Sequence, residues 1–243
     1  MRVARLRVGE AAVEATIEES IARWDGGEAP LENVTLLAPC QPTKIVCVGQ
    51  NYRAHAAELG NPVPVEPLLF FKPPSAIVSP GGEIEYPPWS ELLHYEAELA
   101  VVIATRCRNA RASDALGFVF GYTCFNDVTA RDIQYRDNQW GRAKGFDGSA
   151  CIGPWIETEL DPSSLAVRSY VNGELRQDGA TSDLVFPVPE LIEFISGVMT
   201  LEPGDVIATG TPAGVGELAV GDTIEVDVEN VGRLTNVVAP KPV

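Results

Sequence analysis

The sequence predicts an α+β protein dominated by β-strands, with a small β-rich unit ahead of one larger domain. Short alternating or apolar stretches recur along the 243 residues, and Gly-Asp or Asn-Gly turns separate several of them. Sustained helical periodicity is confined to residues 188–198, where apolar residues recur on one face. We therefore expect an N-terminal β-rich domain over residues 1–40 and a larger domain over residues 41–243.

The N-terminal unit has the pattern of a β-hairpin. Residues 2–8 alternate between polar and apolar side chains, Gly9-Glu10 can turn, and residues 11–17 alternate again. Residues 39–42 contain two prolines and predict a linker before an apolar strand at residues 45–48.

The larger domain is predicted to contain many strands and few helices. A first short helix is expected over residues 52–59, with Asn51 as its N-cap and Gly60 as its stop. A second is expected over residues 128–135, and the third is the periodic segment named above. The clearest strands are residues 98–103, 166–171, 206–208 and 223–228.

Charge and composition exclude some classes of function. The net charge is −16, which disfavours nucleic acids and anionic membrane surfaces as partners. A small anionic substrate would need a local cation to attract it. No apolar run approaches the roughly 20 residues of a membrane span, and the first residues resemble a strand rather than a signal peptide. We expect a cytoplasmic protein whose cysteines are reduced and buried: Cys40, Cys47, Cys107, Cys124 and Cys151.

Three acidic residues, Glu96, Glu98 and Asp127, form what we call the acidic triad. The two glutamates are two positions apart at the start of an apolar strand, so they point to one face. Asp127 follows another apolar strand. Like charges at the edge of a core are unfavourable unless a cation compensates them, and oxygen ligands favour Mg²⁺, Mn²⁺ or Ca²⁺. The alternative is a solvated strand face on which Asp127 caps a helix.

His55 and Glu58, which we call the dyad, lie three positions apart on the first predicted helix and are therefore neighbours on its surface. A carboxylate beside an imidazole orients it and raises its basicity, which suits a general base. Gly49 and residues 60–64 flank this helix in a way typical of a lid. The alternative is a surface ion pair on a mobile helix.

Lys144 is one of only four lysines and stands in a glycine-rich stretch, residues 141–148. It is a candidate for pairing with a substrate carboxylate or stabilising an enolate, and the alternative is ordinary surface solubility. A second glycine-rich stretch, residues 209–216, lacks the Lys-Ser/Thr pair of a nucleotide-binding loop. Its hydroxyls and backbone N–H groups suit a carboxylate instead.

Five segments between residues 44 and 233 together resemble the fumarylacetoacetate hydrolase family. They are VGQNYRAH (48–55), YEAEL (95–99), NDVTARDIQ (126–134), QWGRAKGFD (139–147) and GDVIATGTPAGVG (204–216). The resemblance implies a mixed β-roll, usually in a homodimer, with a small N-terminal domain. It also implies that the acidic triad binds Mg²⁺ or Mn²⁺ (Ca²⁺ in some members) and that the dyad activates water on a lid.

The same resemblance implies the remaining site residues and the chemistry. Lys144 and Gln134 would contact the oxo-acid end of a small anionic 2-oxo acid, and Thr211 would contact its carboxylate. Gly141 and Gly148-Ser149 are smaller than the residues of many relatives, which predicts a wider pocket wall.

The expected activity is that of a 2-hydroxyhepta-2,4-diene-1,7-dioate isomerase/decarboxylase in the breakdown of aromatic compounds. Alternatives are an acylpyruvate C–C hydrolase, an oxaloacetate decarboxylase and a non-catalytic oxo-acid-binding protein.

Overall fold

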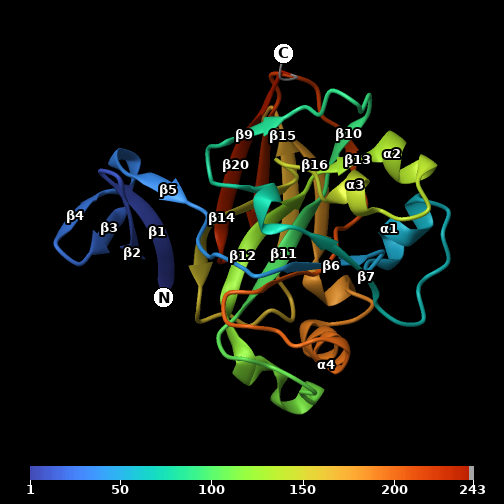
Figure 1. Cartoon of the computed structure of the whole chain (residues 1–243), viewed down its shortest axis with the longest axis horizontal. Coiled ribbons are helices and arrows are strands. Elements are labelled where there is room, and N and C mark those ends of the chain that lie inside the picture. The colour runs from blue at the N-terminus through green and yellow to red at the C-terminus, as the bar shows by residue number, and fades with distance from the viewer. Residues whose placement is uncertain (241–243) are drawn as a thin grey trace.

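The computed structural model describes residues 1–240, and strands make up most of its regular structure (Figure 1). The predicted β-dominated α+β class is confirmed. No helix in the described part of the chain is long and apolar enough to cross a membrane.

The largest sheet has twelve strands and runs through the whole molecule. Its neighbours are antiparallel except for the β17–β6 and β14–β8 pairs. In order they are β4 (Gly27–Pro30), β3 (Ile21–Trp24), β2 (Ala11–Glu18), β1 (Arg2–Val8), β14 (Ala150–Glu157), β12 (Val119–Asp127), β11 (Ala97–Ile103), β17 (Val206–Ala208), β6 (Ile45–Gly49) and β7 (Leu68–Lys72), with β5 (Thr35–Leu37) on β1 and β8 (Ile77–Val78) on β14.

Two smaller sheets complete the strand structure. The five-stranded sheet has the order β16 (Glu174–Ala180), β15 (Ala166–Val171), β19 (Thr223–Val228), β20 (Gly232–Ala239) and β9 (Glu83–Glu85). The three-stranded sheet consists of β13 (Thr129–Ala130), β10 (Leu93–Tyr95) and β18 (Gly216–Glu217).

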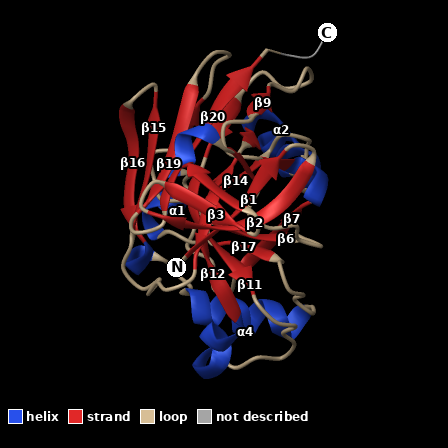
Figure 2. Cartoon of the chain, turned by 90° about the vertical axis from the view of Figure 1, so that its left-hand side faces the viewer, coloured by secondary structure: helices blue, strands red, loops and turns tan. Residues whose placement is uncertain are grey.

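The helices are short and lie around the sheets (Figure 2). They are α1 (Arg53–Glu58), α2 (Arg131–Arg136), α3 (Gly141–Lys144) and α4 (Val188–Val198), with 3-10 turns η1 (Leu31–Asn33), η2 (Pro74–Ala76), η3 (Ala112–Phe118) and η4 (Thr181–Asp183). The helix predicted over residues 188–198 is confirmed with the same bounds.

The main core lies between the five-stranded sheet and the central strands β11, β12 and β14 of the large sheet. Strand β11 shows how one strand serves two faces. Leu99 and Val101 belong to this core, whereas Ala100 and Val102 belong to a second cluster on the opposite face. Because side chains alternate along a strand, Glu98 emerges on the face of the second cluster. That face carries the candidate site.

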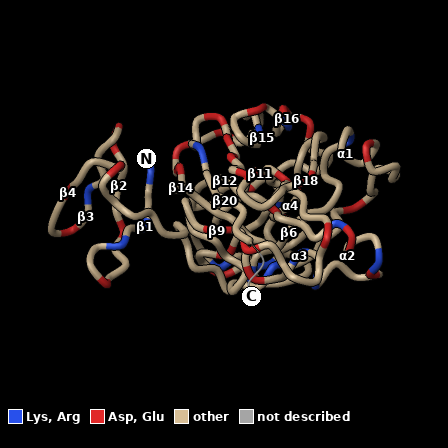
Figure 3. Tube along the Cα trace, turned by 90° about the horizontal axis from the view of Figure 1, so that it is seen from above, with Lys and Arg blue, Asp and Glu red and all other residues tan. Residues whose placement is uncertain are grey.

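The first five strands form a unit with a small apolar core of its own, seen at the left of Figure 1. The hairpin predicted for residues 2–17 is present as β1 and β2. Strand β1 also pairs with β14, and the Met1 ammonium group lies 2.6 Å from Glu157. The unit therefore continues the large sheet. Acidic and basic residues are spread along the whole trace rather than gathered in one segment (Figure 3).

The helix predicted over residues 128–135 begins only at Arg131. Thr129 and Ala130 instead pair with β10, and the Arg131 N–H donates to the carbonyl of Leu92 at 2.7 Å. The prediction of the helix start was wrong because the backbone hydrogen bonds of these residues are made with a distant strand, which local sequence does not reveal.

Asn51 does not cap α1, so this prediction was also wrong. Tyr52 is the N-cap residue and makes no side-chain capping bond. The buried Asn51 amide instead donates to the carbonyls of Phe186 (3.0 Å) and Thr209 (2.8 Å), and its oxygen accepts from the Phe186 N–H at 2.8 Å. Asn51 thus ties the start of the helix to two distant loops.

We expect Asn51→Ala to lower the free energy of unfolding by about 2–4 kcal/mol, because it leaves two carbonyls and one N–H without partners. Chemical denaturation followed by circular dichroism measures this change. Asn33→Ala, at an exposed position, is the matched control. Equal stability of the two variants would contradict the anchoring role.

Candidate active site and metal centre

The structure brings the three carboxylates of the acidic triad together in the interior. One carboxylate oxygen from each lies within 4.8 Å of the others, and all three residues are buried. Glu98 lies on β11, Asp127 ends β12, and Glu96 stands between β10 and β11. The Asp127 N–H donates to the Glu96 carbonyl at 2.9 Å, and Asn126 Oδ1 accepts from the Glu96 N–H at 3.0 Å. The alternative of a solvated strand face is wrong.

Three buried cations surround two of these carboxylates. Lys144 Nζ donates to Glu96 Oε2 and to Asp127 Oδ2, both at 2.7 Å. Arg131 pairs with Glu96 Oε1, and Lys72 Nζ lies 2.7 Å from Asp127 Oδ1. Burial opposes the charge of Glu96, but Lys144 and Arg131 together hold its pKa well below the usual range. The alternative of Lys144 as an exposed solubilising residue is wrong.

Glu98 differs from its two neighbours because it has no ion-pair partner in residues 1–240. Its Oε2 accepts one hydrogen bond, from the Gly210 N–H at 2.8 Å. Burial and the charges of Asp127 and Glu96 raise the pKa of Glu98 well above its ordinary value. A cation shared by the triad would remove this imbalance.

The donor set of the triad fits a hard divalent cation. Three carboxylates offer only oxygen ligands, the type that Mg²⁺, Mn²⁺ and Ca²⁺ prefer. The ammonium group of Lys144 contacts two of the same carboxylates, so an ion bound there would share them with Lys144.

The dyad lies on α1 with its histidine turned inward. His55 Nδ1 is 2.9 Å from Glu58 Oε2, and Glu58 Oε1 accepts from the Gly214 N–H at 2.9 Å. Only 4% of His55 is exposed. Because Nδ1 is engaged by Glu58, Nε2 is the nitrogen left for chemistry. The alternative of a surface ion pair on a mobile helix is wrong for His55, which is buried.

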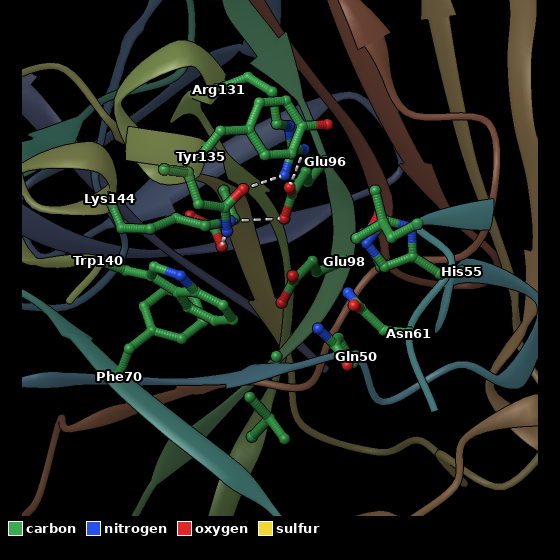
Figure 4. A pocket seen from close by; sticks show the side chains of 16 residues that line it. Gln50, His55, Asn61, Phe70, Glu96, Glu98, Arg131, Tyr135, Trp140 and Lys144 are labelled. Atoms are coloured by element: carbon green, nitrogen blue, oxygen red, sulfur yellow. Dashed lines mark hydrogen bonds and ion pairs between the residues drawn. The ribbon is translucent and has the colours of Figure 1, made fainter. Parts of the chain in front are cut away.

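The triad and His55 of the dyad line one cavity of about 370 Å³. Figure 4 shows Lys144 and His55 on opposite sides of it, with Glu98 between them. Phe70 and Trp140 form a wall, with their rings edge to face and their centroids 5.4 Å apart. The remaining lining residues are Val48, Gly49, Gln50, Leu59, Asn61, Glu96, Asp127, Arg131, Gln134, Tyr135 and Thr211.

Gln134 and Thr211 line this cavity as expected from the sequence, but their polar atoms are partly engaged. Gln134 Oε1 accepts from Arg131, which leaves its NH₂ group for other contacts. The Thr211 hydroxyl donates to the Ala97 carbonyl at 2.8 Å and accepts from Gln177 at 2.7 Å. This hydroxyl proton is therefore already used within the protein.

The three small residues expected to widen the pocket wall, Gly141, Gly148 and Ser149, are not among its lining residues. The Ser149 hydroxyl donates to the Lys144 carbonyl at 2.7 Å. A different glycine shapes the wall: a side chain at Gly49 would bring its Cβ to 2.8 Å from the Trp140 ring.

Sequence reasoning missed Lys72 and Arg131. Lys72 is fully buried, and its ammonium group also donates to the carbonyls of Val128 (3.0 Å) and Lys144. Its position after four apolar residues at 68–71 was a usable signal, since a lysine that is buried at the end of an apolar strand needs acceptors. Arg131 lies in the segment of residues 126–134, and no local feature of that segment indicates its ion pair with Glu96.

Comparison with known proteins identifies the family of the chain. Residues 44–239 match the family described as fumarylacetoacetate (FAA) hydrolase C-terminal. The structure is similar to that of a 2-hydroxyhepta-2,4-diene-1,7-dioate isomerase from Mycobacterium marinum, with a TM-score of 0.92, 41% identity and 100% of both chains covered.

Two further relatives carry other activities. A maleylpyruvate hydrolase from Sphingobium sp. SYK-6, solved with manganese(II) and pyruvate, has a TM-score of 0.86 and 30% identity over 100% of both chains. A mitochondrial oxaloacetate tautomerase from Homo sapiens is 43% identical over 220 residues, which is 85% of this chain and 70% of that protein. The family match and these identities show that the chain belongs to the fumarylacetoacetate hydrolase family.

Proposed function

We propose that this chain is a divalent-metal-dependent enzyme that acts on a small anionic 2-oxo acid through an enolate. The observation that carries the proposal is the convergence of three buried carboxylates, a buried lysine and an oriented histidine on one cavity. A binding scaffold has no physical need to hold three repelling carboxylates together in its interior.

Glu96, Glu98 and Asp127 would hold Mg²⁺ or Mn²⁺. When bound, the ion supplies a positive charge that polarises the 2-oxo group and offsets the negative charge of an enolate. With all three triad carboxylates ionised, their formal charge equals that of Lys72, Lys144 and Arg131, although these cations pair only with Glu96 and Asp127. A divalent ion would therefore leave a local excess of +2, which attracts an anion into a protein of net charge −16.

Lys144 would share the negative charge that develops on the substrate oxygen, because it lines the cavity and its ammonium group contacts the triad. The free NH₂ group of Gln134 would hold the oxo-acid end. Thr211 would contact the substrate carboxylate. Its hydroxyl proton is engaged, so this contact would use another group of the residue or a rearranged hydroxyl.

His55 would transfer a proton of the substrate or of water. Glu58 holds Nδ1, so Nε2 takes a proton from one carbon or from water and returns it elsewhere. Isomerisation of a dienol needs only such proton transfers. Decarboxylation needs no base at the leaving carboxylate.

Isomerisation/decarboxylation of a 2-hydroxyhepta-2,4-diene-1,7-dioate is our first candidate reaction. The full-length similarity to the isomerase from Mycobacterium marinum supports it. Acylpyruvate hydrolysis is the second candidate, because a histidine oriented by a carboxylate is also suited to activating water, and a hydrolase relative shares the fold. Tautomerisation or decarboxylation of oxaloacetate would use the same enolate.

We also propose that the protein works as a cytoplasmic homodimer, as expected from its resemblance to the family. Light scattering coupled to size exclusion is the direct test, and a monomeric mass at working concentration would contradict it.

Turnover assays with Mg²⁺ test the proposed reaction. The substrates are the hepta-diene-dioate, an acylpyruvate and oxaloacetate, and ultraviolet absorbance measures their turnover. We expect the first to be the best substrate by kcat/KM. Turnover of the acylpyruvate alone would overturn this order. Mg²⁺-dependent binding of oxalate, an enolate mimic, without turnover of any of the three would identify a binding protein instead.

We expect His55→Ala to abolish hydrolysis of an acylpyruvate while leaving much of any decarboxylation, since only hydrolysis needs an activated water. Glu58→Gln should lower hydrolysis by roughly 10²- to 10⁴-fold, the usual contribution of general-base catalysis. Glu66→Gln, at an exposed glutamate near the same helix, is the matched control. Equal loss of both activities in His55→Ala contradicts the separation of roles.

We expect Glu98→Gln to remove the rise in melting temperature that Mg²⁺ causes. The pKa of Glu98 is raised by burial, Asp127 and Glu96. In the metal-free folded state Glu98 therefore keeps its proton at a pH at which the unfolded chain has lost it. The free energy of unfolding falls as the pH rises from the ordinary pKa of a glutamate towards the raised pKa of Glu98. Mg²⁺ must displace this proton, so it binds more weakly as the pH falls.

Melting curves at about pH 6 and about pH 8, with and without Mg²⁺, measure both effects. Glu66→Gln again serves as the control and should keep the wild-type response. The same Mg²⁺-induced shift in wild type and Glu98→Gln would remove Glu98 from the metal site.

A further inference from the structure

We propose that Gln50 and Asn61 form an amide pair that binds the substrate tail on the His55 side of the cavity, and that this pair selects 2-oxo acids with a second oxygen acceptor in that tail. The inference rests on the proposed function and extends it to the substrate class. The two residues bracket helix α1, whose middle carries His55, and both line the cavity.

Gln50 occupies a conformation that a glutamine rarely adopts. Its φ of 55° lies in the left-handed region, which costs most residues about 1–2 kcal/mol relative to glycine. Among the described residues it is the one non-glycine residue with positive φ that lines the cavity. Backbone strain of this kind clusters at active sites and ligand-binding sites. Here the strained turn directs the Gln50 amide into the cavity.

Asn61 is placed by the end of the same helix. Gly60 has a φ of 70°, and the Asn61 N–H donates to the carbonyl of Ala56 at 2.9 Å. This reversal of the chain brings the Asn61 side chain back over the cavity. Figure 4 shows both amides pointing toward the cavity from the side of His55, across from Lys144.

Neither amide is used in holding the protein together. Within residues 1–240, the side chains of Gln50 and Asn61 have no hydrogen-bond partner. Asn51, which follows Gln50 in the sequence, instead uses both groups of its side-chain amide in hydrogen bonds to Phe186 and Thr209. The contrast separates a structural amide from two that are free to bind a ligand.

The charges of the cavity determine which ligand groups these amides can recognise. The lysine and arginine that line it, Lys144 and Arg131, are both paired with the triad. The two amides lie on the side of His55, and apart from Lys144 and Arg131 no lysine or arginine is among the described residues that line the cavity (Figure 4). An amide N–H binds a carbonyl or a carboxylate oxygen alike, so the site selects for an oxygen acceptor and does not require a charge.

The test compares ligands that reach the amide pair with one that does not. With Mg²⁺ present, we expect Gln50→Leu and Asn61→Leu each to raise KM for the best polar-tailed substrate by about 3- to 10-fold, the effect of losing one neutral hydrogen bond. The inhibition constant of oxalate, which has no tail, should stay within about twofold in both variants. The kcat values should change less than KM.

Gln50→Gly is the control for misfolding, because glycine removes the side-chain amide and also relieves the strain of the left-handed backbone conformation. It should raise KM as Gln50→Leu does while the melting temperature is kept or increased. Gln41→Leu and Asn33→Leu, at exposed positions away from the cavity, are the matched controls and should leave KM and oxalate inhibition unchanged.

Two results would contradict the proposed role of the amide pair while leaving the proposed function intact. One is an unchanged KM in all three variants, and the other is an equal loss of oxalate and substrate binding. If the wild type neither binds oxalate with Mg²⁺ nor turns over any 2-oxo acid, the proposed function fails and the amide pair fails with it.

Discussion

The structure depends on keeping three carboxylates within 4.8 Å of one another in the interior. Such a cluster is unfavourable in a medium of low dielectric unless opposite charges surround it. The fold provides these charges from separate elements: Lys72 ends β7, Arg131 begins α2 and Lys144 ends α3. The sheet, the two short helices and the loop between them are thereby tied to one electrostatic centre.

The same centre connects structure to chemistry. Lys72 donates to the Lys144 carbonyl and contacts Asp127, so it positions both partners of a second ion pair. Glu98 has no cation partner in the part of the chain that the structure describes, which makes it the member of the triad most affected by a bound ion. Glu58 joins the helix that carries His55 to the loop of Gly214 and so orients the base.

The sequence predicted much of the fold because its strand patterns are local. Alternation and turn residues located β1, β2, β15 and β19, and helical periodicity located α4. The start of α2 and the role of Asn51 were missed because both depend on hydrogen bonds to distant segments. At the site, the spacing of Glu96 and Glu98 indicated a shared direction. The approach of Lys72 and Arg131 depends on tertiary contacts that no single segment encodes.

The first strand of the chain protects a sheet edge. On the outer side of β14, Ala150 and Cys151 pair with β8, whereas Ile156 and Glu157 pair with β1. Pro154 stands between them and has no N–H to offer. Removal of β1 would expose the unpaired backbone around Ile156 to other chains, the situation that leads to edge-to-edge aggregation. The small N-terminal unit thus contributes to solubility from a position far from the acidic triad.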